Sequence, residues 1–320
     1  MIGHCVYTNR MIAGAYRGYG TPQLTWAYES QMDMIAQKIG LDPLEFRLKN
    51  VLREGDVNPV GNVAHSVGVE GCLKQVAQAI GWEERKHVPR VTSGGRRRGF
   101  GIACSTKNTK TPSGSGAVIY FNQDGRITIA TASVEVGQGT RTILAQVVAE
   151  VLGVPVDVIS FSDPDTDFTP FDASTTSSRT TFHMGNALKM AAENLKKQFV
   201  ELGASVFGCG SADIEIRDGR LWPTDRPTDA MTYVEVLRHQ FAAGACLIGQ
   251  AFYYPLSARG KAFHGSSSLF WMYGAHGAEV EVDTETGRVE VTRLAAAIDV
   301  GRAINPTNCL QQIEGGSVHG

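Results

Sequence analysis

The chain has 320 residues, of which 42% are hydrophobic and 19% are charged, so it is long enough for one large or two medium domains with real cores. Its formal net charge of −2 argues against nucleic acid or an anionic membrane surface as a partner. The sequence has neither an apolar run of the roughly 18 residues that a membrane-spanning helix needs nor a signal-peptide core. We therefore expect no membrane insertion.

The first third of the chain is predicted to be mainly helical. A glycine-rich loop over 14–20 carries Arg17 between two aromatic residues, and Thr21 and Pro22 have the residue types of an N-cap and a first helical position. Asp42 begins a capping-box pattern. In order, we expect a short strand over 5–9, helices over 21–39, 42–52 and 69–80, and an exposed linker over 83–95.

From Gly99 onward the pattern changes to strands and turns. We predict a strand over 100–105, hairpins over 117–132, 214–221 and 278–294, helices over 186–202 and 232–242, and a final helix that begins at Asn305 and Pro306. The glycine-rich end, 314–320, is predicted to be a loop. This pattern indicates an α+β fold with mixed or antiparallel sheets, hairpins and packed helices, in two parts, 1–95 and 96–320.

Residues 127–181 have the features of an anion site. A strand-like run stops at Gly137-Gln138-Gly139, and a helix follows that ends at Gly153. A strand over 156–161 and an acidic turn then lead to a loop over 174–181 with seven Ser or Thr residues. Glycines allow close backbone approach, helix N-termini offer free N–H groups, and hydroxyls are short donors. An ordinary turn and an ordinary surface loop remain open alternatives.

For other polar residues in this stretch we expect structural roles. Glu135 is expected to order the glycine loop by hydrogen bonds, and His183 to be a packed or exposed structural residue. A solvated turn is favoured over a divalent-cation site because Pro164 and Phe168 interrupt the order of carboxylates that an EF-hand needs. The carboxylates of this turn are Asp163, Asp165, Asp167 and Asp172.

Scattered cysteines indicate free thiols. No CxxC pair occurs, which argues against a zinc or iron–sulfur site in this chain and against a disulfide scaffold. A cytoplasmic location is the simplest account of such thiols. The six are Cys5, Cys72, Cys104, Cys209, Cys246 and Cys309.

Four ordered segments resemble motifs of the molybdenum-binding subunit of the xanthine dehydrogenase and aldehyde oxidase family. Each is weak alone, but together they span nearly the whole chain and are specific. The first is AYRGYGTPQ at 15–23, similar to (F/Y)RG(F/Y)G-x-PQ, and the second is EVGQG at 135–139, similar to E-x-GQG. The third is TTSSRT at 175–180 with GNA at 185–187, similar to T-x-x-S-x-[ST] and G-[NQ]-A. The fourth comprises the DVG, NP and QIEG segments within 299–315, similar to D-x-G, NP and GQ-x-EG.

The resemblance implies molybdopterin as cofactor, with or without a cytosine dinucleotide. Its dithiolene would hold the molybdenum, so no protein residue is expected to be a metal ligand. Gln138 would hydrogen-bond the oxo or pterin side. The implied cofactor-binding residues are Val136, Gly137, Gln138, Gly139, Thr176, Ser177, Ser178, Thr180 and Gln312.

The same resemblance implies the reaction and the partners. Arg17 would orient the substrate through its oxygen, and Tyr19 would stack on its ring. The reaction would be the oxidative hydroxylation of an aromatic N-heterocycle or aldehyde with water-derived oxygen. Electrons would pass to [2Fe-2S] and FAD on partner subunits or domains. The expected partners are the remaining part of the molybdenum subunit, an iron–sulfur subunit and an FAD subunit.

The sequence also departs from the family pattern. A GGxFG loop upstream of Arg17 is absent, and so is the C-terminal segment whose Glu is the family's general base, so we name no base. We therefore expect a partial subunit that is inactive by itself. Residues 1–95 would form the helical end of a first molybdopterin domain, and residues 96–320 would form an incomplete second one. The loop over 106–116 carries no aromatic residue, which leaves open a heteroaromatic other than a purine, an aldehyde, or an aryl thioester as in hydroxybenzoyl-CoA reductases.

Two further interpretations remain open from the sequence. An NAD-binding Rossmann-like domain would account for the strand, Gly137-x-Gly139, the helix, and Asp163 after the next strand. Thr142 at the third glycine position and the polar Glu135 count against it. A non-catalytic orphan fragment that folds without binding a cofactor is the other.

Overall fold

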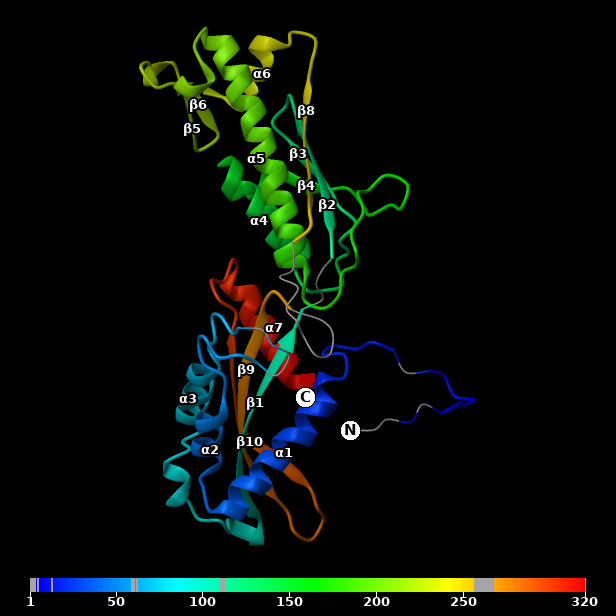
Figure 1. The fold of residues 1–320 in the computed structure, drawn as a ribbon, viewed down its shortest axis with the longest axis vertical. Coiled ribbons are helices and arrows are strands. Elements are labelled where there is room, and N and C mark those ends of the chain that lie inside the picture. Colours follow the sequence, from blue (N-terminus) through cyan, green and yellow to red (C-terminus); the bar gives the residue numbers. More distant parts are fainter. Residues whose placement is uncertain are drawn as a thin grey trace.

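The computed structural model describes residues 4, 6–12, 14–58, 61, 63–109, 113–255 and 268–319. Their helices and strands form two groups along the long axis of the molecule (Figure 1). One group holds α1–α3, α7 and the sheet of β1, β9 and β10. The other holds α4–α6 and two further sheets.

The first group is built on an antiparallel sheet of β1 (Arg97–Asn108), β9 (Trp271–Val282) and β10 (Val289–Asp299), in the order β1-β9-β10. Its core is a cluster of buried apolar residues in which α3 (Val69–Ala79) packs on this sheet. Gly277 on β9 allows the close approach, because a Cβ there would lie 2.6 Å from a methyl group of Val76. The final helix, α7 (Pro306–His319), contacts the same sheet through Ser317, whose Oγ lies 3.1 Å from His276 Nε2.

A buried ion pair joins α1 (Thr21–Ile39) and α2 (Pro43–Asn50) to the edge of β1. Arg47 donates from Nε to Glu29 Oε2 at 2.7 Å, and the amide of Cys104 donates to the same oxygen at 2.9 Å. Glu29 therefore covers the free edge of β1. Burial, and after it the charge of Glu29, raises the pKa of the Cys104 thiol to about 12, so this cysteine is a neutral packing residue.

The second group is built on a mixed sheet in the order β4-β3-β2-β8. In this sheet, β2 is antiparallel to both β3 and β8, whereas β3 and β4 are parallel and joined through α4. The bounds are β2 (Ser115–Asn122), β3 (Ile127–Ala130), β4 (Ile159–Phe161), β8 (Cys246–Tyr253), α4 (Thr140–Leu152), α5 (Thr180–Phe207) and α6 (Tyr233–Gln240). A small third sheet contains β5 (Ile214–Arg217), β6 (Arg220–Pro223) and β7 (Met231–Thr232).

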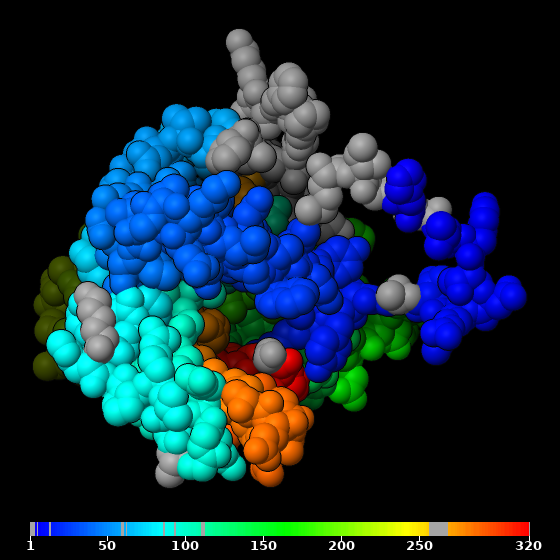
Figure 2. All heavy atoms as spheres, turned by 90° about the horizontal axis from the view of Figure 1, so that it is seen from below, coloured from blue at the N-terminus to red at the C-terminus, as the bar shows by residue number. Residues whose placement is uncertain are grey.

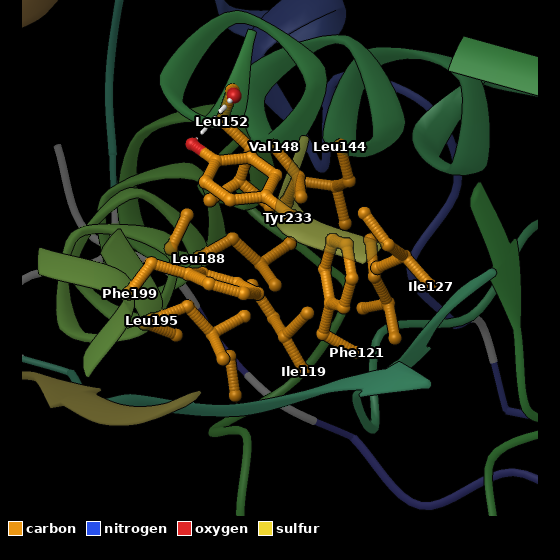
Figure 3. Close-up of a cluster of buried hydrophobic side chains, with 14 of the residues drawn as sticks. Ile119, Phe121, Ile127, Leu144, Val148, Leu152, Leu188, Leu195, Phe199 and Tyr233 are labelled. Carbon is orange, nitrogen blue, oxygen red and sulfur yellow. Dashed lines mark hydrogen bonds between the residues drawn. The ribbon is translucent and has the colours of Figure 1, made fainter. Parts of the chain in front are cut away.

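Three aromatic rings fill the centre of this second core (Figure 3). Phe121 meets Phe199 edge-on at 4.9 Å between ring centroids, and Tyr233 contacts both. The Tyr233 hydroxyl donates to the carbonyl of Leu152 at 3.0 Å, so this buried polar group is satisfied. The rings join β2, α5 and α6 to the end of α4.

The α+β fold class predicted from the sequence is confirmed, and the mixed sheet excludes the doubly wound parallel sheet of a Rossmann-like domain. The predicted hairpins and capped helices are present. Several details of the prediction were wrong. Residues 6–9 form no strand, and the strand β8 was missed. The helix α5 begins six residues before the predicted start, and the N-cap of α1 is Gly20 rather than Thr21. The glycine-rich end is also not a loop, because α7 runs to His319.

Packing joins residues from both sides of position 95, since α3 and β1 share one core. The predicted boundary near residue 95 separates two molybdopterin domains of the family that the sequence resembles, and this domain assignment stays a prediction. No helix within the described residues is long and apolar enough to cross a membrane.

Gly249 on β8 lies at a close contact between the mixed sheet and α5. A Cβ there would lie 2.3 Å from the carbonyl oxygen of Ala191 and 2.6 Å from Leu195 Cγ. Gly249→Ala is therefore expected to lower the free energy of unfolding by about 1–3 kcal/mol through overpacking. Gly101→Ala on β1 is the matched control, because nothing lies within 4 Å of its Cβ position. Equal denaturation midpoints for the two variants would contradict this packing.

Candidate functional site

The predicted site residues lie before the N-termini of three helices and on α7. The turn over 16–20 precedes α1, the glycine loop (residues 135–139) precedes α4, and the hydroxyl loop (residues 174–179) precedes α5. The first backbone N–H groups of a helix have no partner within the helix. The contacts within and between these segments show how the site is held.

Glu135 orders the glycine loop, as the sequence predicted. Its Oε1 accepts from the amides of Gly137 at 2.9 Å and Gly139 at 3.0 Å, and its Oε2 accepts from Arg141 at 3.2 Å. Burial acts to raise the pKa of Glu135, but the backbone hydrogen bonds outweigh it and hold that pKa below its usual value. The amides at the start of α4 are thus bound to a carboxylate of the same loop, which corrects the expectation that they are free for an anion.

Gln138 fixes the glycine loop from within. Its Nε2 donates to Val134 O at 2.8 Å and to Thr140 Oγ1 at 2.6 Å, and its Oε1 accepts from Val136 N at 2.6 Å. The positive φ angles of Gly137 (95°) and Gly139 (82°) permit this tight path. Gly139 also lies against α7, because a Cβ there would be 2.8 Å from Asn308 Nδ2.

Arg179 is the buried centre of the hydroxyl loop, and the sequence analysis did not single it out. The side chain is fully buried, and its five N–H donors match five hydrogen bonds. The acceptors are Asp172 Oδ1, Ser113 Oγ, Ser115 Oγ and the carbonyls of Gly114 and Ser174. The available signal was one cation within a hydroxyl run, seven residues after an aspartate.

The hydroxyl loop is tied to the glycine loop by side chains of its own. Thr175 Oγ1 accepts from Val134 N at 2.9 Å, and the second oxygen of Asp172 accepts from Ser133 at 3.0 Å. Ser177 and Ser178 have left-handed φ angles of 54° and 55°, a strained conformation for residues other than glycine. Such a strained backbone is kept only where surrounding contacts hold it in place. These two serines turn the chain into the start of α5.

On the other side of the site, α7 contacts both the turn over 16–20 and α4. Arg17 donates from one terminal nitrogen to the carbonyl of Gln312 at 2.7 Å and to Gln312 Oε1 at 2.8 Å. Asn305, which accepts from Asn308 N, donates to Gln146 Oε1 on α4 at 3.2 Å. The structure thus brings together Arg17 and Gln312, whereas the Tyr19 side chain is 77% exposed.

The remaining polar residues have structural roles. His183 is fully buried, and its pKa is lowered by burial and then by the charge of Arg179. Asp172 belongs to the Arg179 centre, whereas Asp163 pairs with Arg141 at 2.9 Å. Among the described residues, no group of three or more His, Cys, Asp or Glu side chains could hold a metal ion.

The mixed sheet and the linked loops before α4 and α5 place the chain in the α+β class, with its candidate site at helix N-termini. Residues 75–320 match the family model described as a molybdopterin cofactor-binding domain, and residues 1–51 match a second model of the same description. The chain therefore belongs to the molybdopterin cofactor-binding family that includes the molybdenum-binding subunits of xanthine dehydrogenases and the aldehyde oxidoreductases.

Individual relatives agree with this assignment. The chain is 35% identical to a xanthine dehydrogenase molybdenum-binding subunit of Escherichia coli, over 97% of this chain and 41% of the relative. It is 31% identical to an aldehyde oxidoreductase of Megalodesulfovibrio gigas, over 100% of this chain and 33% of the relative. Quinoline 2-oxidoreductase from Pseudomonas putida 86 superposes with a TM-score of 0.81 at 27% identity, over 95% and 40% of the two chains. The chain thus spans less than half the length of these relatives.

Removing the buried cation should destabilise the hydroxyl loop strongly. In Arg179→Met, Asp172 remains buried without its partner, so we expect the free energy of unfolding to fall by about 3–5 kcal/mol. The control is Arg217→Met, whose ion pair with Asp218 is exposed and should change stability by less than about 1 kcal/mol. Chemical denaturation measures both, and equal losses would show that the Arg179 network contributes nothing special.

The glycine loop should loosen in acid. The lowered pKa of Glu135 means that its carboxylate stabilises the folded loop above its usual pKa, and that this stabilisation disappears as the pH falls through the lowered value. Amide-exchange protection of Gly137, Gly139 and Arg141, measured by NMR, should be high at neutral pH and fall in acid. In Glu135→Gln it should be low throughout, whereas Glu150→Gln, on the exposed face of α4, should behave like wild type. Protection that is independent of pH in the wild type would refute the role of Glu135.

Proposed function

We propose that this chain forms part of the catalytic subunit of a molybdenum hydroxylase. The observation that carries the proposal is the meeting of four segments that are remote in sequence. Arg17 and Gln312, 295 positions apart, are hydrogen-bonded, Thr175 accepts from Val134 beside the glycine loop, and Gly139 lies against Asn308 on α7. A random set of motif matches would not be expected to converge on one region of a fold.

The residues present fit molybdopterin. Nothing lies within 4 Å of the Cβ position of Gly137, so the glycine loop offers a backbone surface that a ligand can approach closely. On the other side, Thr176 and Ser178 are exposed hydroxyls, and the two left-handed serines lead directly into the start of the long helix α5. Successive backbone N–H groups in such a turn form a concavity for anions.

From these features we infer which residues would contact each side of the cofactor. The glycine loop would face one part of the pterin with Val136, Gly137 and Gly139. Gln138 would contact the same part as an acceptor through Oε1, because its two N–H donors are used inside the loop. The hydroxyl loop would hold pterin or phosphate oxygens with Thr176, Ser177 and Ser178, together with Thr180 at the first position of α5. Gln312 on α7 would add a further contact. Arg179 holds its hydroxyl loop from beneath, because its donors are all used within the protein. When bound, the cofactor supplies the redox chemistry that the side chains lack.

The substrate would lie beside Arg17. Its hydrogen bonds to Gln312 use one terminal nitrogen, so the other side of the guanidinium can donate to a substrate oxygen. Tyr19, exposed on the same turn, would stack on an aromatic ring. The names of the relatives, which act on xanthine, aldehydes and quinoline, support an aromatic N-heterocycle or an aldehyde as the substrate class, hydroxylated with water-derived oxygen.

The proposal extends to partners and location. Electrons would leave through [2Fe-2S] and FAD groups on partner subunits or domains, together with the parts of a molybdenum subunit that the relatives carry outside the matched region. The five cysteines in the described residues are free thiols, which favours the reducing cytoplasm.

Gln138→Ala tests the cofactor site. The variant loses three hydrogen bonds inside the glycine loop and the group proposed to face the cofactor, so we expect the molybdenum content of the assembled complex to fall about tenfold or more. Metal analysis of the purified complex measures it. Gln123→Ala is the control, because Gln123 lies in the turn between β2 and β3 and binds Phe241 O. Full molybdenum occupancy in Gln138→Ala would refute the assignment.

A further inference from the structure

Two adjacent glycines lie inside α7, where glycine is costly. Gly315 and Gly316 precede the last turn of this 14-residue helix. Each glycine in a helix interior costs about 1 kcal/mol relative to alanine, so a pair of them is unfavourable unless the missing side chains are needed elsewhere. Their surroundings in the structure show what they make room for.

One face of α7 contacts the turn that carries Arg17. Gln312, Gly315, Gly316 and His319 are spaced i, i+3, i+4 and i+7, which places them in one stripe. At one end of the stripe Gln312 accepts two hydrogen bonds from Arg17. At the other end the His319 ring lies 5.9 Å from the ring of Tyr16, with Nδ1 3.4 Å from the Tyr16 hydroxyl. In Figure 2, α7 (red) is seen between α1 (blue) and the β9–β10 hairpin (orange).

Between these two contacts the Arg17 guanidinium lies flat on the glycines. A Cβ on Gly316 would lie 3.5, 3.6 and 3.8 Å from the Arg17 atoms Nη2, Cζ and Nε. Three nearly equal distances mean that the Cβ position faces the plane of the guanidinium rather than its edge. A Cβ on Gly315 would lie 3.5 Å from Nη1. The planar group thus covers the bare backbone of both residues.

We propose that Gly315 and Gly316 are positioning residues for Arg17, a role that rests on the proposed function of Arg17 in binding the substrate oxygen. Helical side chains point toward the N-terminus of their helix, so a long side chain at position 316 would extend toward Gln312 and occupy the place of the guanidinium. A single methyl group would not, because 3.5 Å is an ordinary van der Waals distance. The structure therefore requires a small residue here, and only a larger one displaces Arg17.

Another helical glycine provides the comparison. Gly71 in α3 is exposed and has nothing within 4 Å of its Cβ position. Gly71→Leu has the same local effect on a helix as Gly316→Leu but no neighbour to displace. A difference between the two variants therefore reports the contact with Arg17 and not helix propensity.

The first readout needs no cofactor. The purified chain is treated with phenylglyoxal, and the rate of modification of Arg17 is followed by mass spectrometry. We expect Arg17 in Gly316→Leu to react several-fold faster than in wild type, because its hydrogen bonds to Gln312 are lost, whereas Gly316→Ala and Gly71→Leu react at the wild-type rate. Gly315→Leu gives a second test if Gly316→Leu does not fold. A wild-type rate in the folded leucine variants overturns the proposal.

The second readout uses the assembled complex. Gly316→Leu should lower kcat/KM about 10²-fold at unchanged molybdenum content, since misplacing a substrate-binding group by about 1 Å costs this much, and Gly316→Ala should restore it. Wild-type kcat/KM in a leucine variant with displaced Arg17 overturns the positioning role. A wild-type complex that contains no molybdenum would overturn the proposed function, and with it the role of Arg17 in binding substrate. In that case the order of labelling rates would still support the contact between Arg17 and the two glycines.

Discussion

The buried guanidinium of Arg179 is the interaction on which the rest of the site depends. A fully buried cation is stable only with its charge paired and its donors satisfied, and the carboxylate of Asp172 with four neighbouring oxygens meets that requirement. These acceptors come from residues 113–115 at the start of β2 and from Asp172 and Ser174, where the hydroxyl loop begins. The same carboxylate reaches Ser133 before the glycine loop. One ion pair therefore links the hydroxyl loop and the residues before the glycine loop to the mixed sheet.

Around this centre, polar groups of the loops form hydrogen bonds within the protein, whereas the backbone at Gly137 and the hydroxyls of Thr176 and Ser178 stay open to a ligand. Glu135 and Gln138 use their side chains to hold the glycine loop, so its backbone is hydrogen-bonded in place by the protein itself. A site fixed in advance loses little conformational entropy on binding. On α7 the same principle applies to Arg17, which is long and flexible in isolation but is held by Gln312 and two glycines. The glycine loop and Arg17 are thus both held by contacts within the protein.

Much of the fold could be predicted from the sequence because its signals are local. The glycine at 153, the Asp42 cap and the turn at Asp124-Gly125 each determine a boundary through the backbone of a few residues. The missed features are those set by distant partners. Gly315 and Gly316 lie against Arg17, which is remote in sequence, and the burial of Arg179 depends on Asp172 and β2. For the site, motif resemblance located the segments, and Glu135 was expected to order the glycine loop. Only the structure shows that its carboxylate accepts from the amides of Gly139 and Arg141, at the start of α4.

The central claim is that these loops bind molybdopterin. The most direct measurement is the molybdenum and pterin content of the protein purified with its partners from the cells that make it. The account predicts close to one molybdenum and one pterin for each copy of this chain, with iron and flavin in the co-purifying chains. Purified protein that folds, retains its partners and contains neither molybdenum nor pterin would contradict it.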